Sequence, residues 1–168
     1  MKRFIFALMM LAATISCAAE SKTVNSVISI VSEYSSDPDI DVISIGKLGI
    51  DIVTVLGKLS VETKEEKDVV ALLSGFNKIL VADYEDAEMT KRQAINSKLT
   101  KALEGAEKII EVKDEEDTVL VYGTSVNDGE KLEDIIIYIP EDCALICFVG
   151  SIDFDKLTDL VKATDESI

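Results

Sequence analysis

The feature that most constrains the fold is a series of four short segments rich in β-branched residues. They are Lys108–Lys113, Thr118–Thr124, Lys131–Ile139 and Cys143–Gly150. The residues between them favour turns, and Asp128-Gly129 supplies the positive φ that a tight hairpin needs. Short connections of this kind join neighbouring antiparallel strands. The sequence therefore predicts a four-stranded antiparallel meander in the C-terminal half of the chain.

Three earlier segments carry apolar residues at helical spacing, which predicts amphipathic helices. They are Val24–Tyr34, a stretch opening at Gly46, and Glu85–Leu103. In the second helix the side chains expected to pack are Leu48, Ile52, Val55, Leu56 and Leu59. The third helix has a narrow apolar stripe that consists of Met89, Ile95, Leu99 and Leu103. A helix with so narrow a stripe is expected at the surface.

Two short strands are expected between these helices, at Asp41–Ile45 and Phe76–Tyr84. A last helix is predicted to begin with Asp153 as its cap. Its apolar face would consist of Phe154, Leu157, Leu160 and Val161. Because the helices come mainly early and the strands mainly late, the predicted class is α+β. We expect helices packed on one face of a mostly antiparallel sheet whose C-terminal half is the four-stranded meander.

The first 19 residues have the pattern of an export signal. Lys2 and Arg3 precede an apolar run from Phe4 to Ile15, and small residues follow it. The run is too short for a membrane-spanning helix, which needs about 20 residues. We therefore predict a signal peptide at residues 1–19 and a single domain at residues 20–168.

Two ways of processing this signal are open. A lipoprotein-type cut before Cys17 would leave that cysteine as the site of a lipid anchor, and the small residues Ser16 and Ala18 suit such a cut. Lipoprotein signals usually carry Leu at the position of Thr14. An ordinary cut after Ala18 or Ala19 would instead remove Cys17. Contact with a membrane is expected only through this anchor on Cys17.

Composition excludes several classes of function. The sequence has 32 acidic and 17 basic residues, a formal charge of −15, and losing Lys2 and Arg3 with the signal makes it −17. Nucleic acids and anionic lipid surfaces attract clusters of Lys and Arg, so no nucleic-acid partner is expected. The chain has no histidine. The usual general base, zinc ligand and middle member of a Ser-His-Asp triad are therefore missing.

Outside the signal the chain has two cysteines, Cys143 and Cys147. Residues four apart on a strand lie about 13 Å apart at roughly 3.3 Å per residue. A disulfide needs Cα atoms within about 7 Å, so a strand here keeps the two residues apart. We predict two buried thiols that act as small apolar side chains.

Several acidic groups are candidate sites, and each has a simpler interpretation. Asp37, Asp39 and Asp41 have the spacing that starts a calcium loop. Val42 and Leu48 replace the glycine and the glutamate that such a loop requires, so a solvated turn is predicted.

The remaining acids are interpreted in the same way. Asp114–Asp117 is predicted to be a hairpin tip that is charged for solubility. Two more groups are interpreted as helix-start residues, since acids there favour the helix dipole. These groups are Glu85, Asp86 and Glu88, and Asp153 and Asp155. No catalytic, metal-binding or cofactor-binding residue is assigned.

Three segments form apolar patterns at strand and helix starts: Asp41–Leu48, Gly75–Val81 and Leu145–Leu157. Together they resemble a family of small bacterial envelope proteins, domain of unknown function 4252 (DUF4252), found largely in Bacteroidota. The resemblance implies export and the α+β fold. It implies no activity, cofactor or site residue, because the family has none assigned.

These observations predict a non-enzymatic exported protein, either periplasmic or anchored by lipid to the cell envelope. We expect a binding or adaptor module whose partner is an unknown protein or small ligand of the envelope. The alternative is an enzyme of unfamiliar type that depends on carboxylates or a divalent metal. No cofactor is expected.

Overall fold

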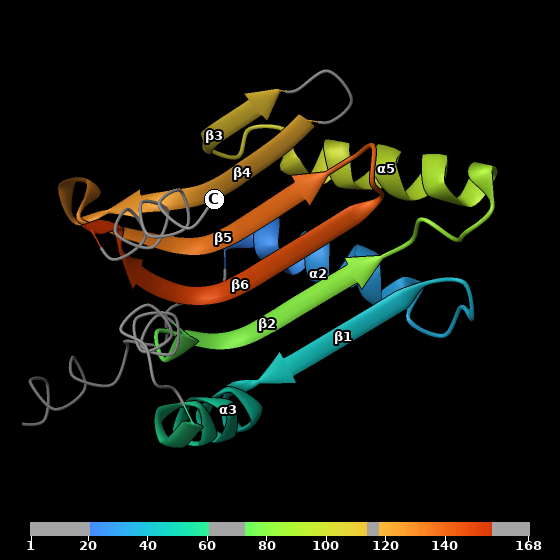
Figure 1. Cartoon of the computed structure of the whole chain (residues 1–168). Coiled ribbons are helices and arrows are strands. Elements are labelled where there is room, and N and C mark those ends of the chain that lie inside the picture. Colours follow the sequence, from blue (N-terminus) through green and yellow to red (C-terminus); the bar gives the residue numbers. More distant parts are fainter. Residues whose placement is uncertain (1–20, 61–72, 114–117, 156–168) are drawn as a thin grey trace, which may run out of the picture.

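The computed structural model describes residues 21–60, 73–113 and 118–155. Six strands form one antiparallel sheet in the order β1-β2-β6-β5-β4-β3 (Figure 1). The strands are β1 (Asp41–Gly46), β2 (Phe76–Asp83), β3 (Lys108–Lys113), β4 (Thr118–Val126), β5 (Lys131–Ile139) and β6 (Ala144–Asp153). Strands β3 to β6 are neighbours in chain order, which confirms the predicted four-stranded meander.

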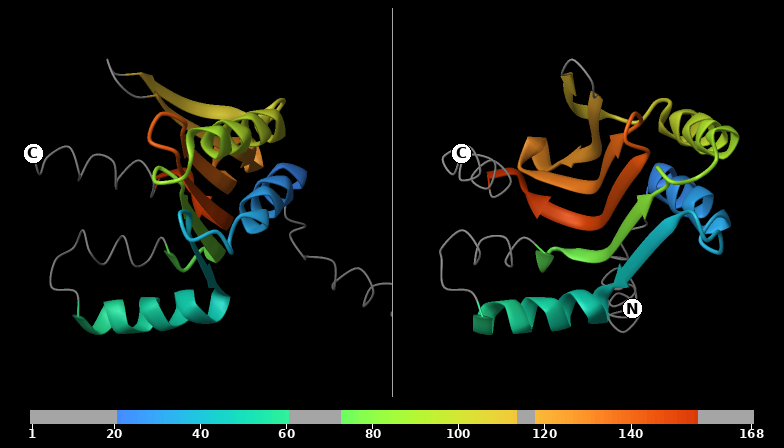
Figure 2. Two further views of the ribbon diagram at one scale, coloured as in Figure 1. Left: turned by 90° about the vertical axis from the view of Figure 1, so that its right-hand side faces the viewer. Right: turned by 45° about the vertical axis from the view of Figure 1, so that its right-hand side comes forward.

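The described helices are α2 (Lys22–Glu33), α3 (Lys47–Ser60) and α5 (Met89–Leu103), with a short 3-10 turn η1 (Asn127–Gly129). Helices α2 and α5 contact each other and lie together on one face of the sheet. Helix α3 extends from the other side (Figure 2). The predicted α+β class with a mostly antiparallel sheet is confirmed, and α2 and α5 pack on one face as expected, whereas α3 lies on the other side. Among the described helices none has the length and apolar character needed to cross a membrane.

The covered face of the sheet forms the main core. Helix α2 contributes Val24, Val27 and Val31, and α5 contributes Ile95, Leu99 and Leu103. These six side chains pack on alternate residues of the central strands, which are Leu80 and Ala82, Ile136 and Tyr138, and Leu145, Cys147 and Val149. Period-2 alternation on the strands and 3.6-residue spacing on the helices thus meet at this face.

Helix α5 begins later than predicted, at Met89 instead of Glu85. The Asp83 carboxylate accepts a hydrogen bond from the Glu85 N–H at 3.1 Å, and the Ala87 N–H donates to the Tyr84 carbonyl at 3.3 Å. Side-chain bonds of this kind compete with helix formation, so residues 85–88 form a turn. Met89, which the sequence placed in the packed stripe, is 66% exposed.

The prediction of which side chains of α3 pack against the domain is wrong. Leu48 and Ile52 are 80% and 56% exposed, whereas Ile50 and Thr54 are buried. The segment has apolar residues on more than one side, so its periodicity did not single out the packed face. The structure describes no side chain for Val55, Leu56 or Leu59.

Local irregularities bend the sheet. The register shifts once in each of β2, β3, β4 and β5, as β-bulges do. In β6 Gly150 has a φ of 137°, and a Cβ atom there would lie 2.5 Å from the Gly75 carbonyl oxygen. Only glycine fits this close crossing of β6 and the start of β2. Positive φ at Asp128 and Gly129 agrees with the turn predicted there.

Candidate functional site

Strands β5 and β6 are apolar on both faces. In β6 Leu145 and Cys147 point toward α2 and α5, whereas Ile146 and Phe148 point to the opposite side. In β5 Ile136 and Tyr138 face the helices, and Ile135 and Ile137 face away. Strands of this composition are typical of sheets that are covered on both faces. The described helices cover only one face fully (Figure 2).

Six β-branched side chains, one from each strand, form a continuous row across the other face. In strand order they are Ile43, Val81, Ile146, Ile137, Val121 and Ile110, and each lies opposite the next in the register. We call these residues the open-face row. Its two ends, Ile43 and Ile110, are 56% and 42% exposed, and the four residues between them are partly exposed. Water therefore reaches an apolar surface that crosses the whole sheet.

One end of this face is closed by a second, smaller core. There Ile50 of α3 packs with Phe76, Ile135 and Ile152, all of them buried. The rings of Phe76 and Phe148 lie 4.9 Å apart between centroids. Helix α3 thus bounds the open-face row on the side where β1 ends and β2 begins.

The opposite ends of β1 and β2 are acidic. Asp41 and Asp83 lie directly opposite each other, and both are exposed. By strand alternation they share the face of Ile43 and Val81. A hollow of about 140 Å³ opens there, lined by Pro38, Asp39, Asp41, Asp83, Glu85 and Asp86. We call these five acidic residues the acidic corner.

The acidic corner joins two groups that the sequence analysis treated separately. Asp39 and Asp41 come from the run that begins at Asp37, and Glu85 and Asp86 follow β2. Chain spacing gave no sign of this proximity, because it depends on the antiparallel pairing of β1 with β2. Within the described ranges, no group of three or more His, Cys, Asp or Glu side chains could hold a metal ion.

The sequence model of the domain of unknown function DUF4252 matches residues 34–160. The chain belongs to the DUF4252 family. No protein of curated function and no solved structure matches the chain. The DUF4252 region contains all six strands, and with them the whole open-face row and the acidic corner, whereas α2 lies before it.

Asp37 lies outside the hollow of this DUF4252 domain and is paired. Its carboxylate is 2.5 Å from the Lys91 ammonium and also accepts a hydrogen bond from the Asp39 N–H. The hydrogen bond from Lys91 lowers the pKa of Asp37, and the one from Asp39 adds to the effect. The solvated turn predicted for the run is therefore observed at Asp39, whereas Asp41 is the exposed first residue of β1 and Asp37 ties the turn to α5.

The other acidic candidates lie apart from this site. Asp153 is the last residue of β6 and directly precedes the helical residues Phe154 and Asp155, so a helix begins where the sequence predicts it; the Asp153 carboxylate is 3.8 Å from the Lys131 ammonium. Asp155 is exposed at the end of the described chain. The rest of the predicted last helix, the tip Asp114–Asp117, the signal at 1–19 and the lipidation candidate Cys17 lie outside the described residues.

A second hollow, of about 230 Å³, lies on the covered side between the start of α2 and strands β4 and β5. Asp134, which has a φ of 54°, lines it. Its two carboxylate oxygens accept hydrogen bonds from the Ser21 N–H at 2.8 Å and the Gly150 N–H at 3.2 Å. These bonds hold the N-terminus of α2 to the bend in the sheet, so Asp134 has a structural role. Sequence reasoning missed it because a bulge residue has no periodic signature.

A polar network is buried under α5. The hydroxyls of Tyr84 and Tyr138 donate to the Asn96 carbonyl oxygen at 2.6 and 3.0 Å, and the Asn96 amide donates to the Pro140 carbonyl at 3.2 Å. Burial raises the pKa of both tyrosines, and that of Tyr84 rises further because Tyr138 lies beside it. Both phenols thus stay neutral and serve the core.

The two cysteines of the domain lie in the same core. Cys143 and Cys147 are buried and not joined by a disulfide, as predicted. Burial raises the pKa of the Cys143 thiol, and nearby Arg92 opposes this effect. A raised pKa makes the reactive thiolate scarce at neutral pH.

Proposed function

We propose that this protein is an exported, non-enzymatic binding module of the cell envelope, and that its partner sits on the open-face row. The observation that carries the proposal is the continuous exposure of six β-branched side chains across one face of the sheet. Contiguous apolar surface on a folded protein marks interaction sites, because exposing it to water is unfavourable.

The contrast with scattered surface residues supports this location. Met89 is a single exposed apolar side chain on α5, and Leu48 has one exposed apolar neighbour, Ile52, a helical turn away on α3; small groups of this kind are normal on a protein surface. The open-face row is different, because its members lie opposite one another along the strand register, and its members on β2, β6 and β5 lie on strands whose other side is buried.

Export rests on the sequence of residues 1–19 and on membership of the DUF4252 family. A cut before Cys17 would place the domain on a lipid anchor, and a cut after Ala18 or Ala19 would release it. Both products leave residues 21–155 unchanged, so either can present the open face to a partner.

The alternative of an enzyme that depends on carboxylates or a divalent metal would have the acidic corner as its site. Its hollow of about 140 Å³ is small compared with ligand pockets, which typically measure about 300–1,000 Å³. We therefore favour a binding role.

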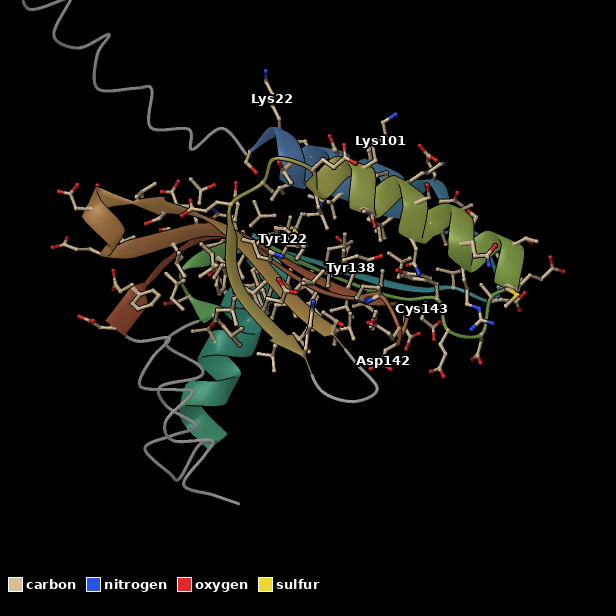
Figure 3. The ribbon with its side chains drawn as sticks, turned by 90° about the horizontal axis from the view of Figure 1, so that it is seen from above. Lys22, Lys101, Tyr122, Tyr138, Asp142 and Cys143 are labelled. Atoms are coloured by element: carbon tan, nitrogen blue, oxygen red, sulfur yellow. The ribbon has the colours of Figure 1, made fainter. Side chains whose placement is uncertain are left out.

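Photo-cross-linking in bacterial cells that express the full sequence tests the proposal. A photoreactive phenylalanine analogue replaces Ile43 or Ile110, the two ends of the open-face row. Matched controls replace Leu48, which is 80% exposed on α3, and Lys101, which points away from the sheet on α5 (Figure 3). We expect discrete adducts in the envelope fraction from the first two positions and none from the controls.

The intact mass of the same material reports the N-terminus. An acylated Cys17, or a chain beginning at Ala19 or Glu20, supports export. Uncut protein in the cytosol would overturn export. Equal labelling from all four positions, or none from Ile43 and Ile110, would overturn the open face as the binding surface.

A further inference from the structure

We infer that the partner on the open face is an amphipathic helix with basic residues at one end, which lies over the acidic corner. The inference rests on the proposed function and specifies the chemistry of the partner. It commits to a peptide segment of another protein, which runs along β1 and β2 with its apolar side on the Ile43 and Val81 end of the open-face row.

A helix suits this face because the face offers no backbone partners. The hydrogen bonds of strands run within the plane of the sheet, and in the described part of the chain only the outer edges of β1 and β3 lack a strand partner. An extended segment laid flat on the row would bury its own N–H and C=O groups unpaired, whereas a helix satisfies them internally. The covered side of this sheet already uses that solution, with α2 and α5 packed on it.

The length of the face sets the size of the helix. Strand β1 has 6 residues, from Asp41 in the acidic corner to Gly46 before α3, or about 20 Å at roughly 3.3 Å per residue. A helix rises about 1.5 Å per residue, so about 14 residues span this distance. Such a helix would make i, i+3, i+4 and i+7 apolar contacts, as in helix-in-groove recognition.

The acidic corner determines which end of the partner is basic. Along β1 the open face reads Ile45, Ile43, Asp41, and along β2 it reads Ile79, Val81, Asp83. The apolar surface thus ends in paired acids, and Asp39, Glu85 and Asp86 follow beyond them. No basic side chain lines this hollow in the described part of the chain. Lys or Arg at one end of the helix would complement it and suppress other partners.

Two other occupants fit the charge less well. A second copy of the chain would bring another formal charge of −15 against the first. An anionic lipid surface would repel the acidic corner in the same way. Self-association and binding to vesicles are both outcomes that the experiment below can detect.

The test measures fluorescence anisotropy of labelled peptides against purified protein expressed from its full sequence. Three peptides of about 14 residues are compared. The first has a leucine stripe and lysines at one end, the second replaces the lysines with glutamates, and the third scatters the leucines around the helix. We expect the basic peptide to bind about tenfold more tightly than the acidic one at low salt, from two or three ion pairs. This preference should shrink at about 0.3 M salt, and the scattered peptide should not bind.

Matched variants place the binding on the protein. Ile43→Gln should weaken the basic and acidic peptides alike, whereas Leu48→Gln, an equally drastic change at an exposed leucine outside the row, should leave both unchanged. The double variant Asp41→Asn with Asp83→Asn should bring the two affinities together. This variant should fold, because it removes two like charges directly opposite each other. Its control is Glu104→Gln with Asp128→Asn at exposed positions elsewhere.

The outcomes separate this inference from the proposed function. If both peptides bind equally and Ile43→Gln weakens both, the open face binds apolar segments without charge selection, and only the inference fails. If no peptide binds while Ile43 still cross-links in the envelope, the partner has other chemistry, and again only the inference fails. Peptide binding that Ile43→Gln leaves unchanged overturns the inference, as does self-association or binding to neutral vesicles that replaces peptide binding.

Discussion

The two faces of this sheet are built from the same strands but are completed differently. Toward α2 and α5, Leu80, Leu145 and Cys147 are no more than 2% exposed. On the other face their immediate neighbours Val81, Ile146 and Phe148 remain partly exposed. Alternation places each pair one residue apart on opposite sides. Residue type therefore does not distinguish the faces, and what distinguishes them is the presence of a covering layer.

This difference shows how a binding surface can be read from a fold. A strand with apolar side chains on both faces implies two covering layers. The described residues supply one complete layer, and α3 at a single end of the other; the remainder of that face is where we propose that a partner binds.

The largest expected effect compares two neighbours in β6. Leu145→Ala should lower the free energy of unfolding by about 3 kcal/mol, because it removes a side chain that is 0% exposed and leaves a cavity. Ile146→Ala, one residue away on the open face, should lower the free energy of unfolding by about 1 kcal/mol, because this partly exposed side chain loses little burial and leaves no closed cavity. Urea denaturation of the purified protein measures both.

Equal losses from the two substitutions would break the contrast. Ile146 would then be as fully covered as Leu145 in the isolated protein, and the open face would not be available to a partner. The control is Leu48→Ala, which should change the unfolding free energy least, since Leu48 is 80% exposed.

A smaller effect should come from the polar network of the covered face. Tyr84→Phe should lower the free energy of unfolding by about 1 kcal/mol at neutral pH, because it removes one of the two hydroxyl hydrogen bonds that the Asn96 carbonyl oxygen accepts. The raised pKa of Tyr84 adds a pH dependence. The folded state keeps the phenol neutral, so its contribution is complete below the ordinary value of 10.0 and is lost as pH rises beyond it.

Urea midpoints measured between about pH 8 and 11 check this dependence. The midpoint of the parent protein should fall above pH 10, and that of Tyr84→Phe should fall less. Lysines with raised pKa values, such as Lys98 and Lys108, also lose their stabilising contribution as pH rises through this range. The informative quantity is therefore the difference in urea midpoint between the two proteins. Parallel curves would show that Tyr84 is not held neutral by the fold.

Much of the fold could be predicted from the sequence, because it follows from local patterns. The meander, both early strands and the helices appeared as runs of β-branched residues, turns and apolar spacing, which are properties of neighbours along the chain. The start of α5 was missed because the Asp83 side chain captures the Glu85 N–H. The packed side of α3 was missed because its segment has apolar residues in several directions.

The candidate site was not predictable in the same way. Ile43 and Ile110 lie at opposite edges of the sheet and are far apart in sequence, so only strand order places them in one row. Asp41 and Asp83 meet for the same reason. The sequence showed apolar strands but not which of their faces α2 and α5 would cover, since this depends on how the whole sheet is assembled.

The smallest expected effect concerns the ion pair that ties the turn before β1 to α5 on the covered side. Asp37→Asn should lower the urea midpoint at neutral pH by less than Tyr84→Phe does, because the Asp37–Lys91 pair is partly exposed. The pair lowers the pKa of Asp37 from 3.8 and raises the pKa of Lys91 from 10.5. Its contribution is therefore complete between those values, and it is lost as pH falls through the lowered pKa of Asp37 or rises through the raised pKa of Lys91. The parent and the variant should differ across the neutral range and converge in acid.

Since Asp37 does not line the acidic corner, the variant should bind the basic-ended peptide as the parent does. Loss of peptide binding in Asp37→Asn would mean that the position of this turn, and not the charge of the corner alone, controls access to the open face.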